Sequence, residues 1–298
     1  MKKAFKWVGI VLLCLLLVAT VALGWYFPHY LKSKQVISVA EQETGQTVIM
    51  SCNVRCLSPL DLGKKSWFYR ADKMMADIAE VAPGIVGFQE VTSWQYSYLT
   101  ETMPQYDSVI TYRENSIIAE GCPIFYHKEL YTLVDKGSFW LSETPEVMSK
   151  DWGAAHYRIC SYVILQERSS QKSFVVFNTH LDHVSDEARI KGIEVVLDKI
   201  EAFGGLPAVI MGDFNAKEDS KTYESVTEHF LDARYETENT TDAPTYQGWG
   251  KAEDKRRIDY FMISKTGFSV EEYSVRSAVF DGVYYSDHCP IVLKLTLE

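Results

Sequence analysis

The stretch GGLPAVIMGDFNAKEDS, residues 204–220, sets a tight limit on the fold. Its apolar run, residues 207–211, lies between glycines, which is typical of a short buried strand. Asp213 and Asn215 follow at positions of the same parity, so we expect both side chains to emerge together at the carboxyl end of this strand. Open α/β sheets bind ligands at that edge. The stretch therefore predicts a polar site at the end of a buried strand.

Strand and helix patterns alternate from residue 47 to residue 298. Apolar or alternating runs predict strands at residues 47–54, 85–90, 122–134, 158–168, 174–180, 207–211, 257–264 and 289–297. Apolar residues at helical spacing predict two helices, residues 68–81 and residues 185–205, and Ser185 or Asp186 is suited to cap the second. The alternation indicates a single α/β domain with mixed sheets.

The composition indicates a large folded domain and argues against non-specific binding to nucleic acid. The chain has 298 residues, of which 47% are hydrophobic and 23% charged, enough to bury a full core. Its formal net charge is -10. This charge opposes non-specific binding to nucleic acid, which depends on lysine and arginine neutralising phosphates, although a metal site can offset it locally.

The amino terminus differs from the rest of the chain. Three lysines precede an uncharged apolar run, residues 7–27, which has about the length that spans a bilayer. The lysines favour a cytoplasmic start and the aromatic residues at both ends suit the two interfaces. We therefore interpret residues 1–28 as a membrane anchor that exports the rest, followed by a polar linker, residues 29–46. The alternatives are a cleaved signal peptide, since residues 19–22 are small, giving a secreted protein, and a buried soluble helix.

The cysteines give little sign of a metal site or a disulfide framework. Cys14 lies in the apolar run, which leaves an odd number of cysteines at irregular spacing. Most of these lie in or beside predicted strands, where cysteine behaves as a small hydrophobe. We favour free thiols over a structural disulfide.

Polar residues stand at the ends of several predicted strands. They are Asn53, Glu90, His180, Asp213, Asp259, Asp287 and His288. Each alone is an ordinary turn or surface residue. Together they supply what metal-assisted phosphoryl hydrolysis requires: hard oxygen ligands for Mg²⁺, a carboxylate to handle water, and donors to hold phosphate.

The motifs around these residues resemble the endonuclease/exonuclease/phosphatase superfamily. They are CNVR, GFQEV, NTHLDH, MGDFNA, RIDYFMIS and SDHCPI, in the order of that family. The resemblance covers residues 47–298. It implies an α/β fold, a four-layered sandwich of two packed mixed β-sheets flanked by helices, with the site at one edge. The sequence as a whole predicts this domain preceded by one transmembrane helix.

The resemblance also implies roles for the metal-binding residues. Glu90 is expected to be the principal Mg²⁺ ligand, with Asn53 beside it and Asp287 close to the metal and phosphate. Mn²⁺ is the alternative ion.

The hydrolytic residues follow from the same resemblance. Asp213 is expected to orient or deprotonate the attacking water, and Asn215 to fix its position. His288, oriented by Asp259, is expected to contact the scissile phosphate, with His180 as a second phosphate donor.

Other residues have two interpretations each. Arg158 is predicted to bind phosphate bidentately, or else to be an arginine at a strand start. For Asp182 and His183 we favour caps of the following helix over a place in the site. Trp140, in a FWLSETP segment like that of other bacterial members, is expected to pack beneath a loop rather than stack on substrate.

These observations predict a Mg²⁺-dependent phosphoesterase displayed outside the membrane, acting on a phosphomonoester or phosphodiester. The acidic balance favours a small or lipid substrate. A nuclease is the alternative, because the basic cluster of residues 251–257 suits a single strand. A catalytically silent binding module is disfavoured, since no expected position is substituted. No protein partner is inferred; the expected partners are the phosphoester substrate and, through the first helix, the membrane.

Overall fold

The computed structural model describes the backbone of residues 2–33 and 45–298. The first element, α1 (Lys2–Ser33), contains a segment, Phe5–Gly24, that is long and apolar enough to cross a membrane by length and composition. The described side chains of this segment are exposed. The predicted linker begins within α1, and its residues 34–44 lie outside the described residues.

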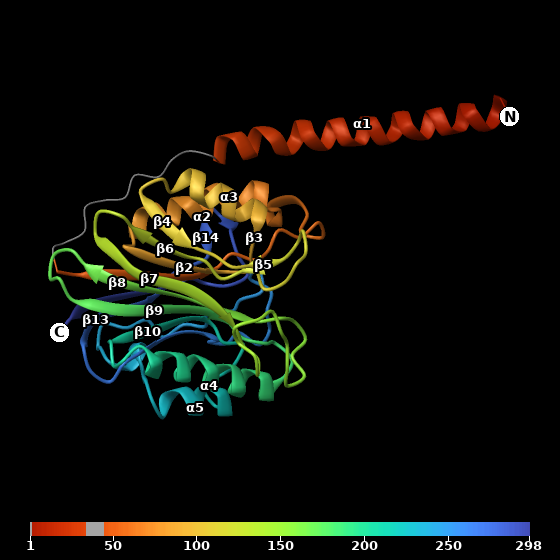
Figure 1. Ribbon diagram of the computed structural model, residues 1–298. Helices are drawn as coiled ribbons and strands as arrows, with labels where there is room; N and C mark the ends of the chain where they lie inside the picture. The colour runs from red at the N-terminus through yellow and green to blue at the C-terminus, as the bar shows by residue number, and fades with distance from the viewer. Residues whose placement is uncertain (1, 34–44) are drawn as a thin grey trace.

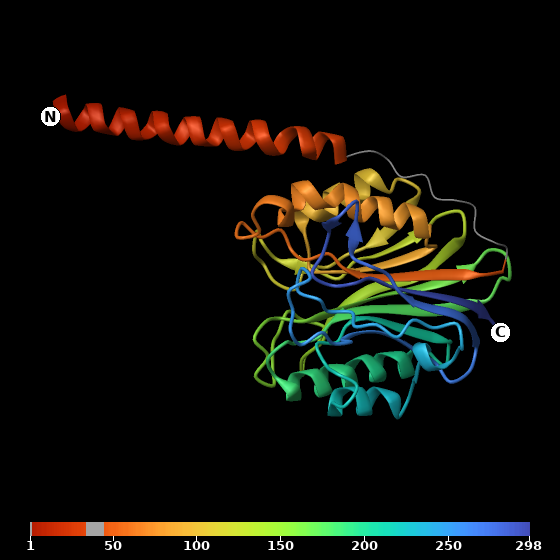
Figure 2. The same ribbon diagram turned by 180° about the vertical axis from the view of Figure 1, so that it is seen from behind.

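Two six-stranded mixed sheets pack face to face, with helices on both outer faces (Figures 1 and 2). The first sheet has the order β13 (Phe268–Val275), β16 (Ile291–Leu297), β1 (Thr47–Asn53), β2 (Ile85–Gln89), β6 (Ile124–His127), β4 (Tyr106–Val109). The second has the order β11 (Leu231–Asp232), β12 (Asp259–Ile263), β10 (Ala208–Asp213), β9 (Ser173–His180), β8 (Ile159–Glu167), β7 (Tyr131–Trp140). This architecture confirms the four-layered α/β sandwich.

Helices and short strand pairs complete the domain. Helices α2 (Trp67–Val81) and α3 (Ser93–Thr102) cover the first sheet, and α4 (Asp186–Ala202) and α5 (Lys221–Thr227) cover the second (Figure 1). Two 3-10 turns, η1 (Gly63–Lys65) and η2 (Ala233–Tyr235), lie in loops. Two-stranded pairs are formed by β3 (Val91–Thr92) with β5 (Glu120–Gly121) and by β14 (Val279–Phe280) with β15 (Val283–Tyr284).

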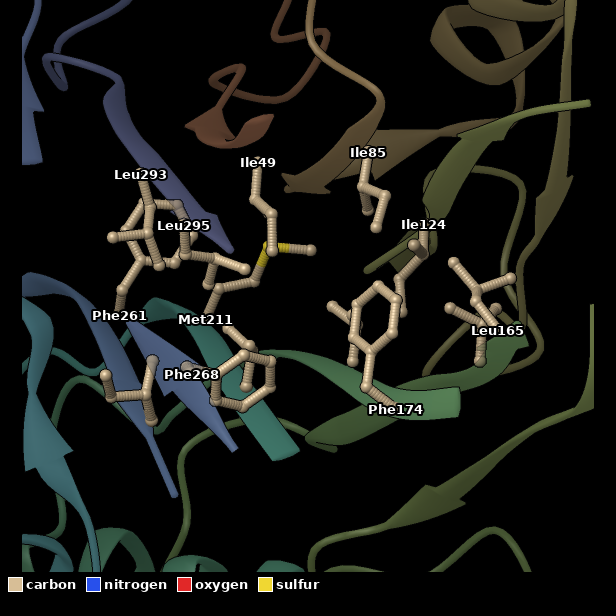
Figure 3. Packing of buried hydrophobic residues seen from close by; sticks show 14 of the residues in the cluster. Ile49, Ile85, Ile124, Leu165, Phe174, Met211, Phe261, Phe268, Leu293 and Leu295 are labelled. Atoms are coloured by element: carbon tan, nitrogen blue, oxygen red, sulfur yellow. The ribbon is translucent and has the colours of Figure 1, made fainter. Parts of the chain in front are cut away.

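The apolar core forms three layers that follow the two-residue period of the strands. In β1, Met50 and Cys52 pack with α2 and α3, whereas Ile49 packs between the sheets. Figure 3 shows this middle layer, in which Ile49 points from the first sheet toward Met211 of the second. A third layer lies between the second sheet and α4. Side chains on the inward face of a strand therefore point into the layer between the two sheets.

A buried polar bridge joins the two sheets. Gln89 Nε2 donates to Asn178 Oδ1 at 2.7 Å, and Asn178 Nδ2 donates to the carbonyls of Phe88 and Pro123. Gly87 lets the sheets approach here, because a Cβ at this position would lie 2.3 Å from Met211 Cε. Buried amides are costly unless they are paired, so this bridge favours one alignment of the sheets.

Gly212 has a similar role one residue before Asp213. Its φ is 136°, and a Cβ would lie 1.9 Å from the carbonyl oxygen of Thr179. Only glycine fits here, since both the backbone conformation and the neighbouring strand exclude a side chain. The glycine thus permits close pairing of β9 and β10 where the site begins.

The structure corrects two expectations about the strands. The single strand predicted for residues 122–134 is wrong: β6 belongs to the first sheet and β7 to the second. The chain turns between them where Leu130 N donates to the carbonyl of His127. Strand β13 was not predicted, because this edge strand carries charged residues on its exposed positions. All six cysteines are free thiols, as expected.

Candidate active site

Three predicted residues lie in one row across the second sheet. His180 and Asp259 are the Cα partners of Asp213 in the two neighbouring strands. Asp213 has the same parity in β10 as Met211, which packs in the middle layer. The three side chains therefore meet at the seam between the sheets, where all three are buried.

Asn53 brings the first sheet into this cluster. It is the last residue of β1, and its Nδ2 lies 3.1 Å from both Glu90 Oε1 and Asp213 Oδ2. Glu90 has a φ of 63°, and its Oε2 accepts a hydrogen bond of 2.9 Å from the Cys56 N–H. A left-handed backbone is uncommon for glutamate, and such strain is typical of functional sites.

Two imidazoles flank Asp213. His288 Nδ1 lies 2.9 Å from Asp259 Oδ2, which leaves Nε2 facing Asp213 Oδ2 at 3.7 Å. His180 Nε2 lies 3.5 Å from the same oxygen. A carboxylate between two imidazoles can take a proton from water while the imidazoles donate to a phosphate.

Burial and charge give these groups different protonation states. Burial raises the pKa of Asp213 to about 7, although the neighbouring His288 opposes this shift. Burial alone lowers the pKa of His288, but Asp259 and Asp213 outweigh it and hold the pKa well above its usual value. Burial, with Arg158 beside it, holds the pKa of His180 well below its usual value. His288 is therefore the cationic imidazole and His180 the neutral one.

Asn215 stands beyond Gly212 as expected. Its backbone N–H donates to Asp213 Oδ1 at 2.9 Å, and its Nδ2 donates to the carbonyl of Leu181 at 3.1 Å. The residue lines the same cavity as Asp213, with a left-handed φ of 49°. These bonds fix the Asp213 carboxylate and the Asn215 amide relative to each other.

The residues around Glu90 suit a divalent cation. Asp287 lines the cavity with Glu90, and among the described residues its buried Oδ1 has no hydrogen-bond partner. Burial raises the pKa of Asp287. Burial also disfavours the ionised form of Glu90, but the Cys56 N–H, His288 and Arg55 outweigh this effect and lower the pKa of Glu90. An unpaired buried carboxylate oxygen beside an ionised carboxylate fits a hard cation that takes oxygen ligands.

A second group of possible metal ligands is better explained by hydrogen bonding. Ligand atoms of Asp213, Asp259 and His288 all lie within 4.8 Å of one another. The Nδ1 of His288 is, however, engaged with Asp259. This geometry fits a hydrogen-bonded histidine better than a metal ligand, so the carboxylates of Glu90 and Asp287 remain the candidate ligands of the ion. Asn53 lies beside them, with its Nδ2 toward Glu90 and its Oδ1 accepting from the Arg55 N–H at 2.9 Å.

A cavity of about 630 Å³ opens over these groups. Its cationic lining residues are Arg55, Arg113, Arg158, Arg189, Lys217 and Arg256. Arg113 and Lys217 lie in loops and Arg189 in α4, where no strand-end pattern marks them. The same lining contains five carboxylates, Glu90, Glu120, Asp213, Asp219 and Asp287, so charges of both signs converge on the cavity.

Arg158 lies in the cavity wall just before β8. Its side chain is buried, with Nη2 3.1 Å from His183 Nδ1 and Nε 3.5 Å from Asp182 Oδ2. The expectation that His183 caps α4 is wrong, because Ser185 is the N-cap and accepts from the Ala188 N–H. Asp182 instead fixes the turn before the helix and binds Arg158.

Arg70 of α2 holds the loops that carry the site. Its guanidinium is fully buried and donates only to backbone carbonyls. The acceptors are those of Val54, Arg55, Cys56, Lys65 and Tyr285. This clamp ties the segment after Asn53 to the segment before Asp287.

The predicted basic cluster is only partly available to a ligand. Arg257 is buried and pairs with Asp232 and Glu218, so its expected contact with a nucleic acid strand is wrong. Arg256 remains at the cavity, where its guanidinium lies 5.1 Å from the ring centroid of Tyr246.

The fold and the site define a hydrolase that acts on phosphoester bonds. A buried carboxylate at the seam of the sandwich, two imidazoles and the oxygens of Glu90 and Asp287 form its centre. The chain belongs to the Endonuclease/Exonuclease/phosphatase family, whose sequence pattern matches residues 50–288. Enzymes of this family generally use a divalent metal.

Known proteins with this fold include bacterial relatives. A Bacteroides vulgatus endonuclease/exonuclease/phosphatase is 31% identical with a TM-score of 0.80, covering 85% of this chain and 99% of that one. The mannosyl-6-phosphatase of Bacteroides thetaiotaomicron is 29% identical with a TM-score of 0.78, covering 84% and 100%. An uncharacterized protein of Acanthamoeba polyphaga mimivirus is 26% identical over 246 residues, 76% of this chain and 91% of that protein.

Proposed function

We propose that this enzyme is a Mg²⁺-dependent phosphatase that hydrolyses a small phosphomonoester. The observation that carries the proposal is the position of Asp213, whose carboxylate lies within 3.1 to 3.7 Å of Asn53, His180 and His288. A water held here meets a proton acceptor on one side and phosphate donors on the other. This arrangement suits in-line attack on phosphorus.

The residues divide the work of one hydrolytic step. Asp213 takes a proton from water as the water oxygen bonds to phosphorus. The bond between phosphorus and the ester oxygen of the substrate breaks, and the released oxygen takes up a proton from solvent. His288 and His180 donate to the phosphate oxygens as charge develops, and Asp259 holds His288 in place. Glu90 and Asp287, with Asn53 beside them, would hold a Mg²⁺ ion, which would supply Lewis-acid stabilisation of phosphate charge.

Charge distribution supports a small phosphomonoester. The cavity lining holds six cations and five carboxylates, whereas the whole chain carries a net charge of -10. A terminal phosphate dianion gains from concentrated positive charge, while a long polyanion meets repulsion outside the cavity. The similar Bacteroides structure named as a mannosyl-6-phosphatase also supports a sugar phosphate.

The test is a substrate panel for the full chain in detergent with Mg²⁺. Phosphate release is measured from mannose 6-phosphate, glucose 6-phosphate and glycerol 3-phosphate, beside cleavage of RNA and DNA oligonucleotides. We expect faster turnover of the small esters. Cleavage of oligonucleotides at physiological salt without release from small esters would overturn the proposal, and binding without any turnover would favour a silent module.

A nuclease is the second candidate, favoured by one wall of the cavity. There Arg256 stacks over Tyr246, and Lys217 pairs with Asp254. An aromatic ring beside cations can hold a single-stranded backbone and base. If this candidate holds, Tyr246→Ala lowers oligonucleotide cleavage far more than release from sugar phosphates.

We further propose that α1 anchors the enzyme with its catalytic domain outside the membrane. The support is the apolar segment Phe5–Gly24 preceded by lysines. Full-length chain should then stay in membranes through alkaline and high-salt washes, and protease should reach the domain only from outside. A soluble form beginning near Leu23 would instead indicate a cleaved signal and secretion.

A further inference from the structure

One wall of the cavity groups two arginines and two histidines. Four side chains form this wall, Arg113, His156, Arg158 and His183. They come from three separate segments: the loop before β5, the approach to β8 and the turn after β9. The wall begins beside His180, since His180 and both arginines also line one small hollow. It therefore extends outward from the place of the scissile phosphate.

Arg113 is fixed by its surroundings. Its Nη1 donates to Glu120 Oε2 at 2.8 Å and its Nη2 to Glu120 Oε1 at 3.1 Å. Its carbonyl accepts a hydrogen bond of 2.9 Å from Trp140 Nε1, which also explains the packed position of that tryptophan. Among the described residues, its buried Nε has no hydrogen-bond partner. The same Nε lies 3.6 Å from Glu114 Oε1, so two carboxylates pre-position the guanidinium at the cavity.

Arg158 and the two histidines are also held in place. Asp182 Oδ2 accepts from the backbone N–H groups of Ala155 and His156 at 3.0 and 3.3 Å. The rings of His156 and His183 stack with centroids 5.5 Å apart. Within the described chain, Arg158 forms hydrogen bonds from Nε and Nη2 alone. Its Nη1 is left for a ligand.

Arg113 and Arg158 repel each other, and the neighbouring Asp182 and Glu120 offset part of this repulsion. Burial lowers the pKa of Arg158, and the charge of Arg113 lowers it further. Burial lowers the pKa of His156 as well, with Arg113 and Arg158 adding to the shift. A bound anion relieves this repulsion, and a desolvated arginine binds carboxylate or phosphate strongly.

We propose that Arg113, Arg158 and His183 bind a second anionic group of the substrate, a phosphate or carboxylate on the same small molecule. This inference rests on the proposed phosphatase function, with the scissile phosphate between His180 and His288. The opposite wall is less suited, since Lys217 is exposed, whereas Arg158 is buried and fixed by hydrogen bonds from Nε and Nη2. The substrate is then a sugar-sized phosphomonoester with at least two negative groups.

The test compares substrates that differ in one anionic group. The values of kcat/KM are measured for the full chain with glucose 6-phosphate, 6-phosphogluconate and glucose 1,6-bisphosphate. We expect the two substrates with a second anion to be preferred by roughly tenfold to a hundredfold, as for a hydrogen bond to a charged group. The paired change Arg113→Gln with Glu120→Gln removes both members of the ion pair and should abolish most of this preference.

Two further variants separate recognition from folding. His183→Asn, at an exposed position, should reduce the preference even if the paired change fails to fold. Arg256→Gln, on the opposite wall, should retain it. Equal kcat/KM for all three substrates in the wild type, or an equal loss on all three in the variants, overturns the second subsite and leaves the phosphatase function standing. Turnover of none of them contradicts the phosphatase function itself.

Discussion

His288 and Asp259 form a buried pair in which Nδ1 and Oδ2 lie 2.9 Å apart. The two residues approach from β12 and from the segment before β16, so the pair joins the two sheets at the site. Because Asp259 occupies Nδ1, the other ring nitrogen is turned toward Asp213. The pair therefore fixes both the direction and the charge of this imidazole.

Asp259→Asn should lower kcat by about 10²- to 10³-fold, the usual effect of losing one donor to developing charge. Asp259 holds the pKa of His288 well above its usual value against the opposing effect of burial. Protonated His288 is present below that raised pKa and is lost as the pH rises through it. Without Asp259 the pKa falls, so the alkaline limb of the kcat profile should move to lower pH. A pH profile that keeps its alkaline limb would contradict this role.

Glu90→Gln should remove most of the stabilisation that Mg²⁺ gives to the fold. A ligand at a hundred times its Kd stabilises the native state by about 2.7 kcal/mol, which is seen as a rise in Tm. We expect this rise in the wild type and its loss in Glu90→Gln, with the metal-free Tm little changed. Glu272→Gln, which breaks a pair with Lys294, is the control and should keep the Mg²⁺ response.

Arg70→Met should cost on the order of 3 kcal/mol in unfolding free energy, because five carbonyls lose a buried donor. Activity should fall more than the unfolded fraction explains, since the clamp aligns the segments that follow Asn53 and precede Asp287. Arg276→Met is the control: it removes an arginine that binds Asp77 and Glu80 on α2. If both variants lose kcat alike at a temperature where they are folded, Arg70 has no special part in positioning.

Gly212→Ala should be much more destabilising than Gly205→Ala. Both glycines have positive φ, which costs about 1–3 kcal/mol for alanine. At Gly205 a Cβ meets nothing within 4 Å, whereas at Gly212 it would lie 1.9 Å from the Thr179 carbonyl oxygen. Chemical denaturation of the two variants measures the difference. Equal losses of unfolding free energy would show that the strands can separate without cost.

Much of the fold and of the central cluster could be predicted from the sequence, because both follow the two-residue period of the strands. Asn53, His180 and Asp213 end strands, and Asp259 begins one, whose alternate residues pack between the sheets, so their convergence could be foreseen. The boundary inside residues 122–134 could not, because β6 and the first residues of β7 are mainly apolar and a turn of ordinary residues separates them.

Part of the cationic lining was not revealed by sequence patterns. Arg113 lies in an irregular loop, where no periodicity relates a residue to the site, whereas the sequence does predict Arg158, at a strand start, and Arg256, in the basic cluster. Arg257, one residue further along, has the same chemistry but is buried in ion pairs with Asp232 and Glu218. Only tertiary contacts distinguish the two neighbours.

The most direct test of the central claim is the rate of phosphate release from mannose 6-phosphate by the wild type and by Asp213→Asn, each with Mg²⁺ and after exhaustive chelation. We predict release by the wild type only with Mg²⁺, and a kcat about 10²- to 10⁴-fold lower in Asp213→Asn with KM changed much less. Wild-type release that survives chelation, or an Asp213→Asn variant with near-normal kcat, would contradict the assignment of this site.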